Sequence, residues 1–261
     1  MNYRIIFYKF GVMKFLGHLD IMRYFQKAFK RAKIDVSYSK GYNPHMIMSF
    51  ASPLGTGLTS DGEYLDVSLN EDIDNKVLID RLNEQMVDGM YIAGAAKLSD
   101  ECKNSMSIVA AATYLVSVKD GYNQEIYYFK NIFREKIKEL YSSDEIKVIK
   151  ATKKSEKEVD IKPLIINIDY NDFDYSNSCA EIFDNQIHVV MTLSAGSENN
   201  LKPELIIKAL CEFCNINYNE FAYQYHRTEM YYREDDDAIK PLLGKDAYDM
   251  LIQRELFVNS N

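Results

Sequence analysis

The chain has 261 residues, of which 47% are hydrophobic and 27% charged, a composition typical of one large or two ordinary folded domains. Its net charge of −8, taken as a total, argues against nucleic-acid binding. No stretch approaches the roughly 20 apolar residues of a membrane span, and four scattered cysteines fit reduced thiols, so we expect a cytoplasmic protein that contacts no membrane.

The first half of the chain is predicted to follow the order strand, helix, strand, strand, helix, strand. Alternation of apolar and polar residues predicts strands, and apolar residues recurring at spacings of three and four predict helices. The strands lie over 3–10, from 36, over 63–69 and over 90–98, and the helices over 18–33 and 75–86. In the first helix, the residues expected to face inward are Leu19, Met22, Phe25, Phe29 and Ala32.

The second half repeats this order. We expect strands over 112–119, 187–193 and 221–232, a hairpin arm over 147–168, and helices over 124–140 and 203–214. The order is that of the split βαβ unit, so the predicted fold class is α+β with two tandem ferredoxin-like domains. The domains are predicted over 1–105 and 106–234, followed by an acidic linker and a short helix, around 246–256, within 235–261.

Positive charge is concentrated at the start of the chain. Residues 1–50 hold nine basic side chains against two acidic ones, an excess of seven positive charges. Four of the basic side chains, Arg23, Lys27, Lys30 and Arg31, share one face of the predicted helix, opposite its apolar side. Such a stripe can follow a phosphate backbone, although charged helix faces are often only solvated surface.

Two polar clusters flank this helix. His18 and Asp20 lie where a strand gives way to the helix, so His18 is a candidate general base, or Asp20 caps the helix and His18 is a solvated turn residue. Tyr42, Asn43 and His45 surround Pro44 on a stiff turn, where they suit base stacking and recognition. They would also suit a small-molecule pocket, or the turn only serves local backbone groups. We expect His18 and His45 to converge on one basic face.

Other chemically able residues favour structural roles. Cys211 and Cys214 form a CxxC inside a predicted helix without a second pair, which indicates core thiols rather than a metal site. Arg227 and Glu229 share one face of a strand and could pair with each other. Lys153 and Lys154 lie in a charged part of the hairpin arm, typical of a solvated ribbon. No motif indicates a cofactor or metal.

Five motifs stand out along the chain: KFLGHLD at 14–20, YSKGYNPH at 38–45, SDGEYLD at 60–66, EVDIKPL at 158–164 and RTEMYYRE at 227–234. They resemble motifs of the radical-SAM-linked proteins, a family of unassigned function, and the resemblance runs through most of 1–234. The chain departs from it at Met46, where a second proline is expected. The resemblance implies a companion of a radical-SAM enzyme in RNA or ribosome metabolism, and it supplies no catalytic residue.

The favoured function is therefore a radical-SAM-associated accessory protein that binds structured RNA, such as rRNA or tRNA. The expected contacts are His18, Asp20, Arg23, Lys27, Lys30, Arg31, Tyr42, Asn43 and His45. Two alternatives stay open: a metal-independent endoribonuclease with His18 and His45 as its acid–base pair, and an adaptor that docks onto a radical-SAM enzyme or the ribosome. Fold-level likeness to the ferredoxin-like ribonucleases that process CRISPR repeat RNA is analogy alone.

Overall fold

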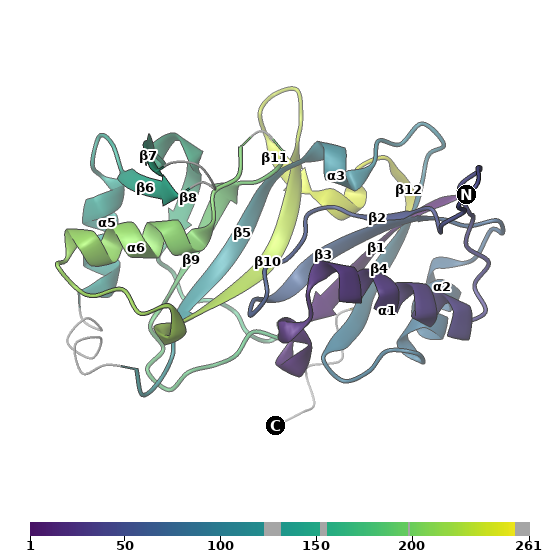
Figure 1. Ribbon diagram of the computed structural model, residues 1–261, viewed down its shortest axis with the longest axis horizontal. Coiled ribbons are helices and arrows are strands. Elements are labelled where there is room, and N and C mark those ends of the chain that lie inside the picture. The colour runs from purple at the N-terminus through teal and green to yellow at the C-terminus, as the bar shows by residue number, and fades with distance from the viewer. Residues whose placement is uncertain (123–131, 152–155, 198, 254–261) are drawn as a thin grey trace. The chain divides into compact units, whose positions relative to one another are not determined.

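A computed structural model describes residues 1–122, 132–151, 156–197 and 199–253 of the chain (Figure 1). It shows a mixed fold of mostly antiparallel strands and few helices, as the predicted class requires. Within these residues, no helix is long and apolar enough to cross a membrane. The chain divides into two compact units: unit 1 comprises Met1–Ala111, Asp174–Ala180 and Arg227–Asn261, and unit 2 comprises Ala112–Phe173 and Glu181–His226.

Unit 1 is a sheet with two helices on one face (Figure 1). Its strands follow the order β12-β4-β1-β3-β10, and short β2 also pairs with β3. The elements are β1 (Asn2–Lys9), η1 (Gly11–Phe15), α1 (His18–Arg31), β2 (Met48–Phe50), β3 (Thr59–Ser68), α2 (Asn75–Asn83), β4 (Met90–Leu98), α3 (Ser105–Ile108), the part of β10 (Tyr223–Arg233) from Arg227, β11 (Ile239–Pro241), η4 (Leu242–Gly244) and β12 (Ala247–Ile252).

The core of unit 1 lies between the sheet and the two helices. Alternate residues of β1, including Tyr3, Ile5 and Phe7, pack against Phe25 of α1 and Leu78 of α2. This alternation arises because successive strand side chains point to opposite faces of the sheet. One inward face of the sheet and the inward sides of both helices therefore share a single apolar core.

The buried side of α1 differs from the predicted one at its start. Phe25, Phe29 and Ala32 are buried as expected, together with Ile21, whereas Leu19 is 59% exposed. Because each residue turns the helix by about 100°, Leu19 lies well away from the direction of Phe25. The helix ends where Lys33 takes a left-handed backbone conformation with φ of 52°.

Unit 2 contains the strand order β10-β5-β9-β8 and a separate β6–β7 hairpin. Its elements are β5 (Val109–Val118, in unit 2 from Ala112), α5 (Phe133–Tyr141), β6 (Lys147–Ala151), β7 (Glu156–Asp160), η2 (Lys162–Leu164), β8 (Ile165–Asp169), β9 (His188–Ser194), α6 (Pro203–Phe213), η3 (Glu220–Ala222) and the part of β10 up to His226. The predicted helix over 124–140 is confirmed from Phe133 onward. Its earlier part, together with Lys153 and Lys154, lies outside the described residues.

The predicted C-terminal helix is wrong where the chain is described, because residues 247–252 form strand β12. This strand pairs antiparallel with β4, with Met250 opposite Ala96. Gly94 makes the pairing possible, since a Cβ added there would lie 2.7 Å from the carbonyl oxygen of Leu251. The free backbone edge of β4 therefore outweighs the local helical pattern.

Candidate functional site

A small cavity in unit 1 lies where β1 gives way to α1. Its lining includes Lys9 of β1, His18 of α1, Phe50 of β2 and Glu63 of β3. Its volume of about 20 Å³ admits one water or one ligand oxygen. The His18 ring stands edge-on to the Phe50 ring, with the centroids 5.4 Å apart, and its imidazole has no polar partner in the described part of the chain.

Lys9 is a buried cation in this cavity. Its residue is 2% exposed, and its Nζ donates a hydrogen bond of 2.9 Å to the carbonyl oxygen of Leu16. Burial lowers the pKa of Lys9, Glu63 opposes that shift, and Arg227 adds to it. The sequence prediction missed this residue, although Lys9 continues the inward row of Tyr3, Ile5 and Phe7, and a lysine in an apolar row is the signal that could have revealed it.

Glu63 and Arg227 form a buried ion pair beside Lys9. The Arg227 Nε and one terminal nitrogen donate to the two Glu63 carboxylate oxygens at 2.8 and 2.7 Å, and the same nitrogen donates to Ser52. The predicted pairing of Arg227 with Glu229 is therefore wrong, since Glu229 accepts a hydrogen bond from the Tyr64 hydroxyl instead. Together with Lys9, the ion pair gives this buried group one net positive charge, and Lys9 and Glu63 line the same cavity as His18.

A second cavity in unit 1 lies under the predicted Tyr42–His45 turn and has a volume of about 380 Å³. His45 lines it, and the His45 Nδ1 is hydrogen-bonded to the Ser39 hydroxyl at 2.9 Å. Tyr42 is fully exposed, at 107%, and Asn43 is exposed beside it. The turn is thus held internally by Ser39 and presents its aromatic ring to solvent.

His18 and His45 lie in separate cavities. The cavity of His18 is lined by Lys9 and Glu63, and that of His45 by Asn2 and Ser68, with no residue common to both. These two sets mark opposite ends of the β1–β3 ladder, about 20 Å apart at 3.3 Å per residue. The structure therefore does not bring the two histidines together as an acid–base pair.

The basic side of α1 is exposed along its length. Arg23 lies 3.5 Å from Asp20 in an exposed pair, so Asp20 does not cap the helix. Arg31 donates to the carbonyl oxygen of Gln85 at 2.9 Å. Lys27 and Lys30 are exposed and have no acidic partner among the described residues. Two of the four cations are thus available to an anionic partner without loss of an internal contact.

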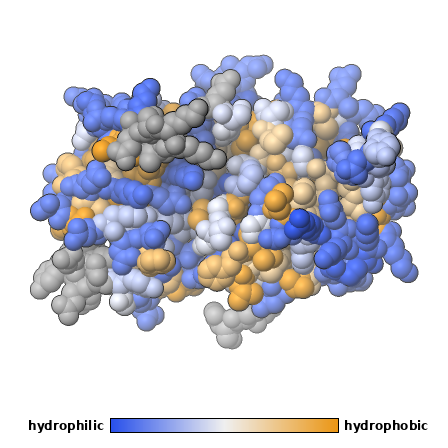
Figure 2. Space-filling view, viewed as in Figure 1, coloured by the Kyte–Doolittle hydropathy of each residue, from blue (hydrophilic) through white to orange (hydrophobic). Residues whose placement is uncertain are grey.

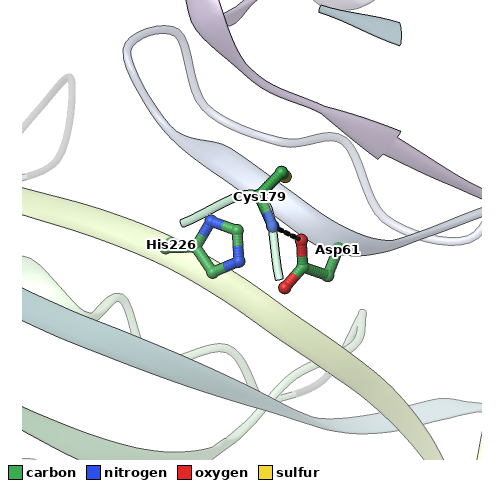
Figure 3. A group of neighbouring side chains, drawn as sticks. All are labelled: Asp61, Cys179 and His226. Atoms are coloured by element: carbon green, nitrogen blue, oxygen red, sulfur yellow. Dashed lines mark hydrogen bonds between the residues drawn. The ribbon is translucent and has the colours of Figure 1, made fainter. Parts of the chain in front are cut away.

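The cysteines behave as thiols within packed surroundings. In unit 1 the buried Asp61 carboxylate accepts a 2.9 Å hydrogen bond from the backbone N–H of Cys179 (Figure 3). Burial raises the pKa of the Cys179, Cys211 and Cys214 thiols, so none is an activated thiolate. Within either unit alone, the described residues offer no group of three side chains arranged to hold a metal ion.

Comparison with known protein families identifies the family of the chain. No curated protein matches the chain. The model of a family described as "Uncharacterized protein conserved in bacteria (DUF2344)" matches residues 2–203, a range that holds the α1 face, the polar turn and both cavities with their lining residues. Because this match covers well over half of the chain, the chain belongs to the DUF2344 family of proteins conserved in bacteria.

Proposed function

We propose that the protein binds RNA through the basic side of α1 and acts as an accessory protein rather than as an enzyme. The observation that carries the proposal is the exposure of Arg23, Lys27, Lys30 and Arg31, with Lys27 and Lys30 unpaired among the described residues. Binding of such cations to phosphates releases counterions from the nucleic acid, which favours association at low salt. The face extends about 12 Å along the helix, enough for a short stretch of backbone.

The Tyr42–Asn43–His45 turn supplies contacts of a second kind. An exposed aromatic ring stacks on unpaired bases, while amide and imidazole groups hydrogen-bond to base edges. The proposed target is therefore structured RNA with single-stranded loops, such as rRNA or tRNA. The resemblance to radical-SAM-linked proteins supports a radical-SAM enzyme or the ribosome as the setting in which this RNA is bound.

We also propose that both units are ferredoxin-like. In unit 1 four strands follow the order β4-β1-β3-β2 in the sheet. Helix α1 connects β1 to β2, and helix α2 connects β3 to β4. In unit 2 the order is β10-β5-β9-β8, with α6 between β9 and β10. The same arrangement of first, second, third and fourth strands in both units supports this assignment.

The test is RNA binding across a salt series for the wild type and the Lys27→Ala/Lys30→Ala variant. Loss of two phosphate contacts is expected to reduce the slope of log affinity against log salt by about 1.4 for a single-stranded contact. The control, Lys202→Ala/Lys208→Ala, removes the same charge from exposed positions of unit 2 and should leave the slope unchanged. A flat wild-type slope, or equal binding by both double variants, would refute the proposal.

A protein adaptor is the second candidate, and one observation favours it. Val12, Phe15 and Leu19 are 74%, 65% and 59% exposed, and Figure 2 shows hydrophobic surface over η1 and the start of α1. Exposed apolar side chains that lie together often mark a protein interface. In a pull-down from lysate, the wild type should recover a radical-SAM enzyme or ribosomes, and a Phe15→Ser/Leu19→Ser variant should not. If the wild type recovers neither, this candidate function is contradicted.

A further inference from the structure

Several uncharged hydrogen-bonding groups line the cavity under the polar turn. His45 Nε2 has no partner among the described residues, and neither do the Nδ2 hydrogens of Asn2. Ser49 accepts a hydrogen bond from Asn104, which leaves the Ser49 hydroxyl hydrogen available as a donor. The lining thus offers both donors and acceptors to a ligand.

The charges around this cavity argue against an anionic ligand. No lysine or arginine is among its described lining residues, and the single acidic one, Asp66, is bound by the Arg4 guanidinium at 2.8 Å. Burial raises the pKa of the Cys102 thiol in its wall, and Asp66 adds to the shift, so this group is also uncharged at neutral pH. A phosphate would find no countercharge here.

Size and wall chemistry narrow the ligand further. A volume of about 380 Å³ falls in the range of small-molecule sites. The apolar part of the lining includes Ile47, Met48 and Leu98, together with Tyr3, Met46 and Val67, which belong to the core of unit 1. Apolar walls suit the faces of a flat ring, and mixed polar groups suit its edge. A nucleobase combines these properties, since it has an aromatic face and a polar edge of donors and acceptors.

We propose that this cavity receives one unpaired nucleobase of an RNA strand whose phosphates lie on the basic side of α1. The proposal rests on the proposed function and deepens it, because it assigns phosphate and base to different surfaces of unit 1. The chain runs from the last turn of α1 to Ser39 at the cavity, with exposed Lys33 on that path and exposed Lys40 directly after Ser39. A base next to the inserted one stacks on Tyr42.

The Cys102 thiol provides a probe of the cavity in the unmodified protein. Iodoacetamide alkylation of each cysteine is followed by peptide mass spectrometry, with Cys214 of unit 2 as the internal reference. Single-stranded RNA at ten times its dissociation constant should slow Cys102 alkylation about tenfold by mass action and leave Cys214 unchanged. RNA of the same length without bases should bind the basic side and leave Cys102 alkylation at its free rate.

Two outcomes separate this inference from the proposed function. Salt-dependent binding of RNA without protection of Cys102 overturns the nucleobase site and leaves RNA binding by α1 standing. If free nucleoside monophosphates protect Cys102 but the protein binds no RNA, two claims are overturned: that the base in the cavity belongs to an RNA strand, and that the protein is an RNA-binding protein. Equal protection by RNA with and without bases also overturns the site, because the backbone alone would then cover the thiol.

A Tyr42→Ala variant gives an independent measurement. Tyr42 makes no packing contact that its loss would disturb, since the side chain is fully exposed. Loss of stacking on one base should weaken single-stranded RNA binding by about five- to a hundredfold. Tyr248→Ala, which removes another exposed aromatic of unit 1, is the matched control and should bind as the wild type does. Equal affinity of the two variants contradicts the stacking role.

Discussion

The buried ion pair of Glu63 and Arg227 predicts that removal of Glu63 destabilises the fold more than removal of Arg227. The two side chains are 5% and 3% exposed and are joined by two hydrogen bonds of 2.7 and 2.8 Å. Removal of one partner from such a pair leaves an uncompensated buried charge and costs about 3–5 kcal/mol. The neighbouring Lys9 decides which removal costs more, since it interacts electrostatically with both partners.

Glu63→Gln leaves two buried cations, Lys9 and Arg227, without a carboxylate. Arg227→Met leaves Glu63 and Lys9, whose opposite charges attract each other. We therefore expect Glu63→Gln to lower the free energy of unfolding by about 5 kcal/mol and Arg227→Met by about 3 kcal/mol. The double variant should cost at least about 1.5 kcal/mol less than the sum, because the two side chains share one interaction.

Urea unfolding followed by far-ultraviolet circular dichroism measures these differences, and the chain contains no tryptophan to serve as a fluorescence probe. Asp80→Asn, which breaks the exposed Lys76–Asp80 pair of 2.8 Å, is the control and should cost less than about 0.5 kcal/mol. If Arg227→Met proved more destabilising than Glu63→Gln, the assignment of a net positive charge to this buried group would be wrong.

Three further predictions concern stability. Burial lowers the pKa of Lys9, so between that lowered pKa and 10.5 the unfolded chain binds more protons than the folded chain. The wild type should therefore gain stability relative to Lys9→Met as the pH rises through this window, as measured by urea unfolding at each pH. Gly62→Ala should destabilise by about 1–3 kcal/mol, since its Cβ would lie 2.6 Å from Glu229 Cα, whereas Gly244→Ala meets nothing within 4 Å and should leave the melting temperature nearly unchanged. Asp74→Ala removes the carboxylate that caps α2 and should cost about 1 kcal/mol in urea unfolding; no loss would contradict the capping role.

Local patterns in the sequence were sufficient for most of the secondary structure. Helical spacing predicted α1 and α2, and alternation predicted β1 and β3, because side-chain direction within a helix or strand depends on nearby backbone geometry. The same reasoning correctly placed Lys27 and Lys30 on the exposed side of α1.

The errors occurred where distant segments compete with a local pattern. Residues 247–252 looked helical but form β12, because the edge of β4 offers hydrogen-bond partners about 150 residues earlier in the chain. Leu19 fitted an apolar spacing but lies outside the buried side of α1. Neither the strand at 247–252 nor the exposure of Leu19 can be predicted from neighbouring residues alone.

The candidate sites divide in the same way. Sequence alone determined the basic side of α1 and the exposed turn at Tyr42, because charge spacing and a proline turn are local properties. Tertiary structure alone decided that Glu63 pairs with Arg227 across 164 residues, that Lys9 is buried beside them, and that His18 and His45 occupy separate cavities. Burial and ion pairing depend on which strands become neighbours in the sheet, and that is set by packing of the whole unit rather than by local propensity.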